Sequence, residues 1–160
     1  MPFTLRPATD SDRPFLRQFM LEHWGGDMML AHGETFYPAE HPAFIAESDG
    51  QAAGVITYWF RNGECEVTSL ESLRREQGIG TALMNAVIAE AKKASCRRVW
   101  LITTNDNLNA LRFYQKRGLR LVVLYPGAVD ESRKLKPEIP LIGENGIPIR
   151  DEIELEMILS

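Results

Sequence analysis

Hydrophobic positions at helical spacing mark the clearest element of the chain. After residue 78 apolar residues recur at every fourth position, at Ile79, Leu83, Val87 and Ala91. This spacing is typical of an amphipathic helix and predicts one over residues 78–94. A second apolar stripe begins shortly after Thr9, a residue type that often caps helix N-termini, and contains Phe15, Leu16, Phe19 and Met20. We expect that helix to end where two glycines follow Trp24.

Stretches rich in apolar residues and bounded by turn signals predict the strands. They cover residues 3–6, 43–48, 51–60, 64–71, 97–104 and 119–125. Asp49-Gly50 and Asn62-Gly63 supply the positive φ angles of two-residue turns, so the second, third and fourth strands should be antiparallel neighbours. The fifth strand follows a helix, and a strand–helix–strand connection implies a locally parallel pair.

A further helix is predicted over residues 108–117. Asn105 or Asp106 can cap its N-terminus, and Gly118 suits the position just after its end. By contrast, residues 27–42 mix apolar side chains with histidines without a clean period. They predict a semi-irregular helix or loop, whose histidines can simply be solvated.

The C-terminal part of the chain is punctuated by turn formers. Residues 126–150 contain four prolines and three glycines, which predicts a long Pro/Gly-rich loop over residues 125–150. A loop of this length suggests a lid or a binding loop, with a surface wrap or a homodimer contact as alternatives. Apolar residues then alternate with glutamates, which predicts a final half-buried strand over residues 151–159.

Length and composition narrow the class of protein. With 160 residues the chain fits one domain, 1–160, of ordinary globular composition. The N-terminus lacks a signal peptide pattern and no apolar run approaches the ~20 residues of a membrane span, so we expect a cytoplasmic protein with no membrane partner. A formal charge of −4 argues against nucleic acid as a partner. Cys65 and Cys96 lack metal-ligand spacing, so we expect reduced, buried thiols and no metal.

The start of the central helix combines two glycines with cationic neighbours. Gly78 and Gly80 remove side chains where backbone N–H groups have no intrahelical partner, and the helix dipole favours an anion there. Arg74 and Arg75 precede the same loop. The loop does not fit a dinucleotide fingerprint or a P-loop, because a third small residue and a Gly-Lys-Ser/Thr tripeptide are both missing. A purely structural strand-to-helix connection is the alternative.

Two motifs in order resemble those of a known family. Arg75-x-x-Gly78-x-Gly80 resembles the coenzyme A pyrophosphate loop of the GNAT family, the acetyl-CoA-dependent N-acetyltransferases. Residues 107–119 are similar to the family's Asn-x-x-Ala, Tyr and Gly-Phe pattern, with Leu119 in place of Phe. The resemblance covers about residues 3–125 and points to a poorly characterised bacterial subgroup. It implies an α/β fold with one mixed, mostly antiparallel twisted sheet of about six or seven strands, about four helices, and a central parallel pair splayed for coenzyme A.

The resemblance also implies a set of cofactor-binding residues and an activity. Residues expected to contact acetyl-CoA are Leu70, Glu71, Arg75, Gln77, Gly78, Ile79, Gly80, Thr81, Asn107, Asn109 and Tyr114. The backbone amides of residues 77–81 would bind the pyrophosphate, and a backbone N–H near Leu70 would polarise the thioester carbonyl. Either asparagine can instead be a helix cap. The activity implied is direct acetyl transfer to a primary amine of a small molecule or a protein.

Candidates for proton transfer follow from the same resemblance. Tyr114 matches the family's usual acid near the sulfur, although it can also be a core residue. Glu66 and Glu64 lie on one face of the strand where several members place the base, and His32 and Glu34 are weaker candidates. Two other functions stay open at this point. One is a non-catalytic acyl-CoA-binding or regulatory module, and the other is an interaction domain whose glycine loop is structural.

Overall fold

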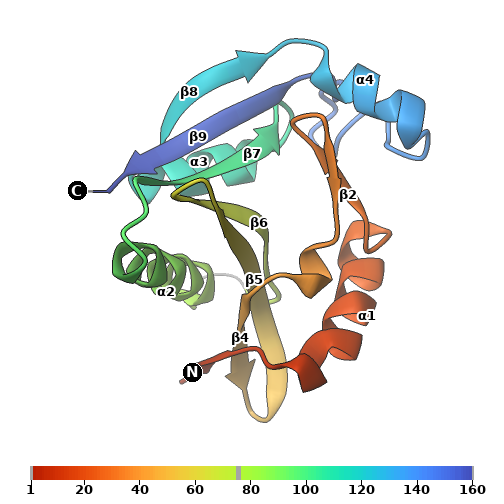
Figure 1. Ribbon diagram of the computed structural model, residues 1–160. Helices are drawn as coiled ribbons and strands as arrows, with labels where there is room; N and C mark the ends of the chain where they lie inside the picture. Colours follow the sequence, from red (N-terminus) through yellow and green to blue (C-terminus); the bar gives the residue numbers. More distant parts are fainter. Residues whose placement is uncertain (1, 75–76, 160) are drawn as a thin grey trace. The chain divides into compact units, whose positions relative to one another are not determined.

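The computed structural model describes residues 2–74 and 77–159, and the chain divides into two compact units. The first comprises Met1–Met29, Tyr37–Val99 and Leu159–Ser160, and the second comprises Leu30–Phe36 and Trp100–Ile158. Figure 1 shows the elements of both. In the described residues, seven strands form one sheet, mostly antiparallel with one parallel pair, accompanied by four α-helices and a separate two-stranded hairpin. This confirms the predicted mixed α/β fold class, whereas the splay of the parallel pair and the single-domain organisation stay predictions.

The strands of the first unit follow the order β1-β4-β5-β6, and neighbouring strands are antiparallel. Their bounds are Thr4–Pro7, Ala43–Ser48, Gln51–Arg61 and Glu64–Ser72. Both residues of each two-residue turn have positive φ, at 55° and 75° for Asp49 and Gly50 and at 55° and 74° for Asn62 and Gly63. The two predicted hairpins are therefore confirmed.

Two helices cover opposite faces of these strands. α1 (Arg13–Trp24) follows a short 3-10 turn, Asp10–Asp12, and ends at Gly25 with a φ of 75°. Its apolar face packs into a core cluster that includes Val55 of β5. α2 (Ile79–Lys93) packs on the adjacent Gly54, whose Cβ position would lie 2.8 Å from Ile79 Cγ2. Because side chains alternate along a strand, adjacent residues point to opposite faces.

The strands of the second unit follow the order β7-β9-β8. β7 spans Arg98–Thr104, β8 Arg120–Tyr125 and β9 Glu152–Ile158, while α3 covers Leu108–Lys116. β8 and β9 are antiparallel, with Tyr125 opposite Glu152. The apolar residues of β8 are exposed, from Val123 at 38% to Leu124 at 58%. β8 is therefore an edge strand that the described part of the chain leaves largely uncovered.

The structure corrects three local expectations. Residues 27–42 contain a hairpin, β2 (Met29–Ala31) and β3 (Glu34–Phe36), followed by a 3-10 turn, Pro38–Glu40. Strands of three residues are too short to show a period, and the turn uses a histidine at positive φ, His32 at 42°, before Gly33 at 77°. The cap of α3 is not Asn105 or Asp106 but Asn107, whose Oδ1 accepts the N–H of Ala110 at 3.2 Å, which confirms the alternative role that the sequence allowed for Asn107.

The third correction concerns residues 125–150, which contain a helix rather than only a loop. α4 spans Ala128–Leu135 and begins after Gly127. Acidic residues in its first turn and basic residues in its last turn complement the helix dipole. Arg133 ties α4 to the segment that follows, because its guanidinium donates to the carbonyls of Ile139, Pro140 and Ile149. These hydrogen bonds hold together a segment whose prolines and glycines predicted an irregular loop.

Candidate active site

The N-terminus of α2 has the backbone geometry of an anion site. Gly78 is the N-cap with a φ of 76°, and no heavy atom of the described residues lies within 4 Å of the place where its Cβ would be. The first helical turn contains no acidic residue. Ile79 and Leu83 are 1% and 0% exposed, so the apolar face holds the helix start in place. The first backbone amides of a helix lack intrahelical partners, which suits a pyrophosphate.

The structure gives the surroundings of most of the other residues expected near this loop. The Oε1 atom of Gln77 is buried and has no hydrogen-bond partner in the described part of the chain, so it can accept a hydrogen bond from a bound molecule. Leu70 and Glu71 lie near the end of β6 and pair with residues of β5. Gly80 and Thr81 form part of the first turn of α2. Arg75 lies outside the described residues.

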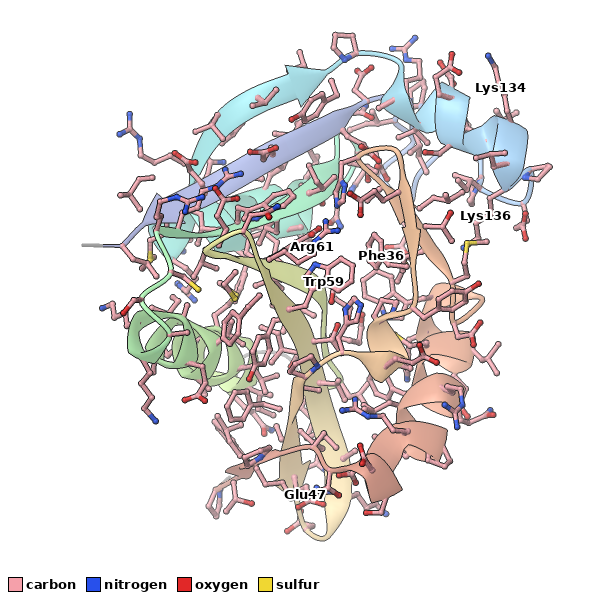
Figure 2. All side chains as sticks on the ribbon, in the orientation of Figure 1. Phe36, Glu47, Trp59, Arg61, Lys134 and Lys136 are labelled. Atoms are coloured by element: carbon pink, nitrogen blue, oxygen red, sulfur yellow. The ribbon has the colours of Figure 1, made fainter. Side chains whose placement is uncertain are left out.

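Glu66 is held in a buried aromatic and cationic setting. It is 3% exposed, and its Oε1 accepts the indole N–H of Trp59 at 3.0 Å. The same oxygen lies 3.9 Å from Nη2 of Arg61, whose guanidinium carbon stands 4.2 Å from the centre of the Trp59 ring. Figure 2 labels Trp59 and Arg61 side by side on β5. A strand-face glutamate would ordinarily be solvated, so this burial makes Glu66 distinctive among the predicted bases.

His41 belongs to the same cluster, and sequence reasoning missed it. Its ring stacks on Trp59 at 4.2 Å between centroids, and its Nδ1 lies 2.9 Å from Oγ1 of Thr68. His41 is 7% exposed, so the simple interpretation of a solvated histidine is wrong here. Its pKa is lowered to about 4, chiefly by burial; the charge of Glu66 opposes this shift, and the charges of Arg13 and Arg61 add to it. The imidazole is therefore neutral at pH 7.

Glu64 shares a strand face with Glu66 but has different partners. Its carboxylate lies 3.2 Å from Nη2 of Arg97 and 3.2 Å from Nη2 of Arg98. Each of its two oxygens is therefore engaged by a guanidinium group. The geometry thus favours Glu66 over Glu64 as the base, and both roles stay predictions.

The predicted site residues of the second unit lie on α3. Asn107 caps this helix, as described above, while Oδ1 of Asn109 accepts a hydrogen bond from Nη2 of Arg112 at 2.9 Å. Tyr114 is 9% exposed, and its ring meets Phe113 edge-on at 5.3 Å between centroids. Its burial suits both a core residue and an acid that works away from water. The contacts of these three residues with acetyl-CoA stay predictions.

The second unit also contains a pocket, lined in part by residues of the segment 125–150, for which a binding loop was one of the expectations. It has a volume of about 670 Å³ and includes His32, a weaker candidate from the sequence, and Glu152. Glu34 is exposed on β3 and does not line it. Glu152 and Glu154 are only 4% and 7% exposed, although the alternation along β9 suggested a polar outer face. No sequence signal distinguishes these buried carboxylates from solvated ones.

Among the described residues no helix combines the length and the apolar character that a membrane span requires.

Comparisons with known proteins agree with the two motifs and the fold. The model of the acetyltransferase (GNAT) family matches residues 6–119. An uncharacterised protein of Bacillus subtilis strain 168, YdhI, is 44% identical over 155 residues, which cover 96% of this chain and 97% of that protein. An acetyl-CoA-bound GNAT acetyltransferase from Elizabethkingia anophelis has a TM-score of 0.70 at 21% identity, covering 98% of each chain.

A second solved structure, a Bacillus subtilis acetyltransferase in complex with CoA, has a TM-score of 0.68 at 20% identity. It covers 99% of this chain and 98% of that one. At these identities the two structures establish the fold alone. Because the family model spans most of the chain and YdhI is 44% identical over nearly its whole length, this chain belongs to the GNAT family of acetyltransferases.

Proposed function

We propose that the protein is an N-acetyltransferase that transfers the acetyl group of acetyl-CoA to a primary amine by direct attack. The observation that supports this most is the open N-terminus of α2 at Gly78, found in a chain of an acetyltransferase family. The acceptor is a small molecule or a protein. When bound, acetyl-CoA supplies an acyl group already activated as a thioester.

Holding the donor falls to backbone groups of the first unit. The amides of residues 77–81 bind the pyrophosphate, with Arg75 in support, and the backbone around Leu70 and Glu71 meets the acyl arm. Asn107 and Asn109 provide further polar contacts. Backbone amides suit this task because they are fixed by the helix, so little reorganisation accompanies binding.

Transfer forms a C–N bond, breaks the C–S bond, removes two protons from the nitrogen and adds one to the sulfur. An alkylammonium has a pKa of about 10.4 in water, so the attacking nitrogen must lose its first proton before or during attack. Glu66 takes this proton, directly or through a water, and passes it to solvent. Trp59 and Arg61 fix the orientation of its carboxylate. Tyr114 gives a proton to the departing thiolate and regains one when the acylated nitrogen loses its second proton.

Calorimetry and thiol release test the proposal together. We expect stoichiometric binding of acetyl-CoA to the purified protein, and release of free CoA thiol when a panel of primary amines is added. Absence of binding at millimolar acetyl-CoA would refute the function. Binding without thiol release for any amine would instead favour the non-catalytic acyl-CoA-binding module.

Variants assign the proton-transfer roles. Glu66→Gln and Tyr114→Phe should each lower kcat about 10²-fold while the Kd for acetyl-CoA changes less than about threefold, because general acid–base catalysis contributes about that much. Glu64→Gln should have a smaller effect on kcat, since its partners are two arginines. Glu22→Gln and Tyr37→Phe, at exposed positions, are the matched controls. Unchanged kcat in Glu66→Gln or Tyr114→Phe would remove that residue from the mechanism.

A further inference from the structure

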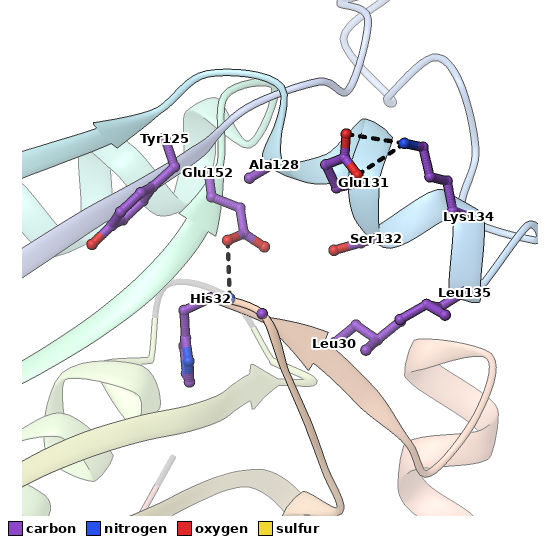
Figure 3. A pocket seen from close by; sticks show the side chains of 10 residues that line it. Leu30, His32, Tyr125, Ala128, Glu131, Ser132, Lys134, Leu135 and Glu152 are labelled. Carbon is purple, nitrogen blue, oxygen red and sulfur yellow. Dashed lines mark hydrogen bonds and ion pairs between the residues drawn. The ribbon is translucent and has the colours of Figure 1, made fainter.

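The pocket of the second unit is formed by three segments that lie far apart in sequence. Its volume of about 670 Å³ falls within the range of about 300–1,000 Å³ that is usual for small-molecule sites. Its walls come from the β2–β3 hairpin, from α4 together with Tyr125 at the end of β8, and from Glu152 at the start of β9. The lining residues are Leu30, His32, Gly33, Tyr125, Ala128, Glu131, Ser132, Lys134, Leu135 and Glu152 (Figure 3).

Glu152 is the buried charge of this pocket. It is 4% exposed, and its Oε1 accepts the backbone N–H of His32 at 3.0 Å (Figure 3). Within residues 2–74 and 77–159 this is the one hydrogen bond of its side chain. Burial disfavours the charged carboxylate and raises the pKa of Glu152 above its ordinary value, while the His32 N–H and the charge of the His32 side chain oppose the rise. A cation bound beside Glu152 would therefore stabilise its charged form.

The other charges of the pocket compensate one another. Glu131 and Lys134 form an ion pair at 3.0 Å on α4, and their side chains are 72% and 70% exposed. In Figure 3 the dashed lines join Glu131 and Lys134 to each other, and none joins either of them to Glu152. Leu30, Ala128 and Leu135 are the apolar side chains of the lining. An exposed pair of opposite charges contributes little net field, so Glu152 dominates the electrostatics of an otherwise apolar cavity.

We propose that this pocket binds a small organic amine with one ammonium group and an apolar body, with the ammonium on Glu152 and the body against Leu30, Ala128 and Leu135. The inference rests on the proposed function in one respect only, namely that this ligand is the acetyl acceptor. One buried carboxylate neutralises one ammonium, and apolar walls disfavour a second charge. The pocket thus selects a small mono-amine over a polyamine, and over a protein segment too large for the cavity.

Binding without transfer provides the test. Isothermal titration with benzylamine, benzyltrimethylammonium, benzyl alcohol and benzoate separates charge from shape, and the quaternary ion cannot be acetylated. We expect benzylamine to bind most tightly, the quaternary ion next, and benzyl alcohol at least tenfold more weakly than benzylamine. Equal affinity of benzylamine and benzyl alcohol, or preference for benzoate, would overturn the proposal.

Two variants locate the site. Glu152→Gln keeps an oxygen that can accept the His32 N–H, so it should fold, and it should weaken benzylamine at least tenfold while leaving benzyl alcohol unchanged. Ala128→Trp fills the pocket and should weaken both ligands. Glu131→Gln is the matched control at the exposed rim and should change the Kd for benzylamine less than about twofold, because exposed ion pairs contribute little.

The Kd for acetyl-CoA, measured on the same samples, separates the two proposals. Binding of benzylamine without binding of acetyl-CoA would support the amine-binding pocket and refute the transferase function. Binding of acetyl-CoA without binding of benzylamine would refute only the amine-binding pocket. Retention of full benzylamine affinity in both Glu152→Gln and Ala128→Trp would show that the amine binds elsewhere and would also overturn the proposal.

Discussion

Glu66 and Glu152 are both almost completely buried, yet their neighbours give them different chemistry. Glu66 shares one oxygen between an indole N–H and a nearby guanidinium, so its charge is partly compensated within the protein. Glu152 has a single neutral donor, the His32 N–H. Because removing a charge from water is costly unless it is paired, Glu152 gains more from a cationic ligand than Glu66 does. This difference is why we assign proton transfer to Glu66 and cation binding to Glu152.

The neutral imidazole of His41 predicts an acid-sensitive contribution to stability. Its folded pKa of about 4 lies below the value of 6.5 expected in the unfolded chain. Between these values the unfolded state binds a proton that the folded state does not, so the free energy of unfolding falls as the pH drops from about 6.5 to 4. At 1.36 kcal/mol per pKa unit, the loss is about 3 kcal/mol by pH 4, and it is absent above pH 6.5.

Urea unfolding of the wild type and of His41→Gln between pH 7.5 and 4.5 measures this contribution. The variant lacks the group that resists protonation, so its stability should decline less over this range than that of the wild type. His23→Gln, at an exposed position on α1, is the matched control and should follow the wild-type curve. Parallel pH curves for the wild type and His41→Gln would contradict the assignment of a buried neutral imidazole.

At the scale of elements, α2 approaches β5 so closely that a single methyl group matters. A Cβ on Gly54 would lie 2.8 Å from Ile79 Cγ2, 3.1 Å from the Glu71 carbonyl oxygen and 3.2 Å from Leu83 Cδ1. We predict that Gly54→Ala destabilises the protein by about 1–3 kcal/mol, the usual cost of overpacking. Because the same contact holds the first turn of α2, the variant should also bind acetyl-CoA more weakly.

Gly26→Ala is the control for this prediction. No atom lies within 4 Å of its Cβ position in the described residues, so the free energy of unfolding from urea titration should stay within about 0.5 kcal/mol of the wild-type value. A Gly54→Ala protein as stable as Gly26→Ala would show that α2 shifts freely on the strand.

Elements with a strong local signal were predictable from the sequence. The conformations of α2 and of the Asp-Gly and Asn-Gly turns depend on residues that are close in sequence. The motifs around Gly78 and Tyr114 indicated the family. The β2–β3 hairpin and α4 were not predictable, because three-residue strands show no period and the helix lies among prolines. The burial of His41, Glu66 and Glu152 also depends on residues distant in sequence, so the sequence pattern suggested solvated side chains instead.

At the scale of the whole molecule, the two units are interleaved along the chain. The chain passes from one unit to the other after Met29, Phe36, Val99 and Ile158. The last crossing returns the C-terminus to the first unit, where the N–H of Leu159 donates to the carbonyl of Arg97 at 2.8 Å. Neither unit is a continuous stretch of sequence. The segments of each unit are joined through the other unit, so unfolding one unit frees the ends of the segments that form the other.

This interleaving predicts that thermal unfolding is one cooperative transition. Trp59 reports on the first unit and Trp100 on the second, so two variants that retain either tryptophan, with phenylalanine at the other two tryptophan positions, give each unit its own fluorescence signal. Within each variant the midpoint from fluorescence should coincide with the midpoint from far-UV circular dichroism, as two-state unfolding requires. Comparing both probes in the same protein removes any effect of the substitutions on stability. A fluorescence midpoint several degrees away from the dichroism midpoint in either variant would show that the units unfold separately.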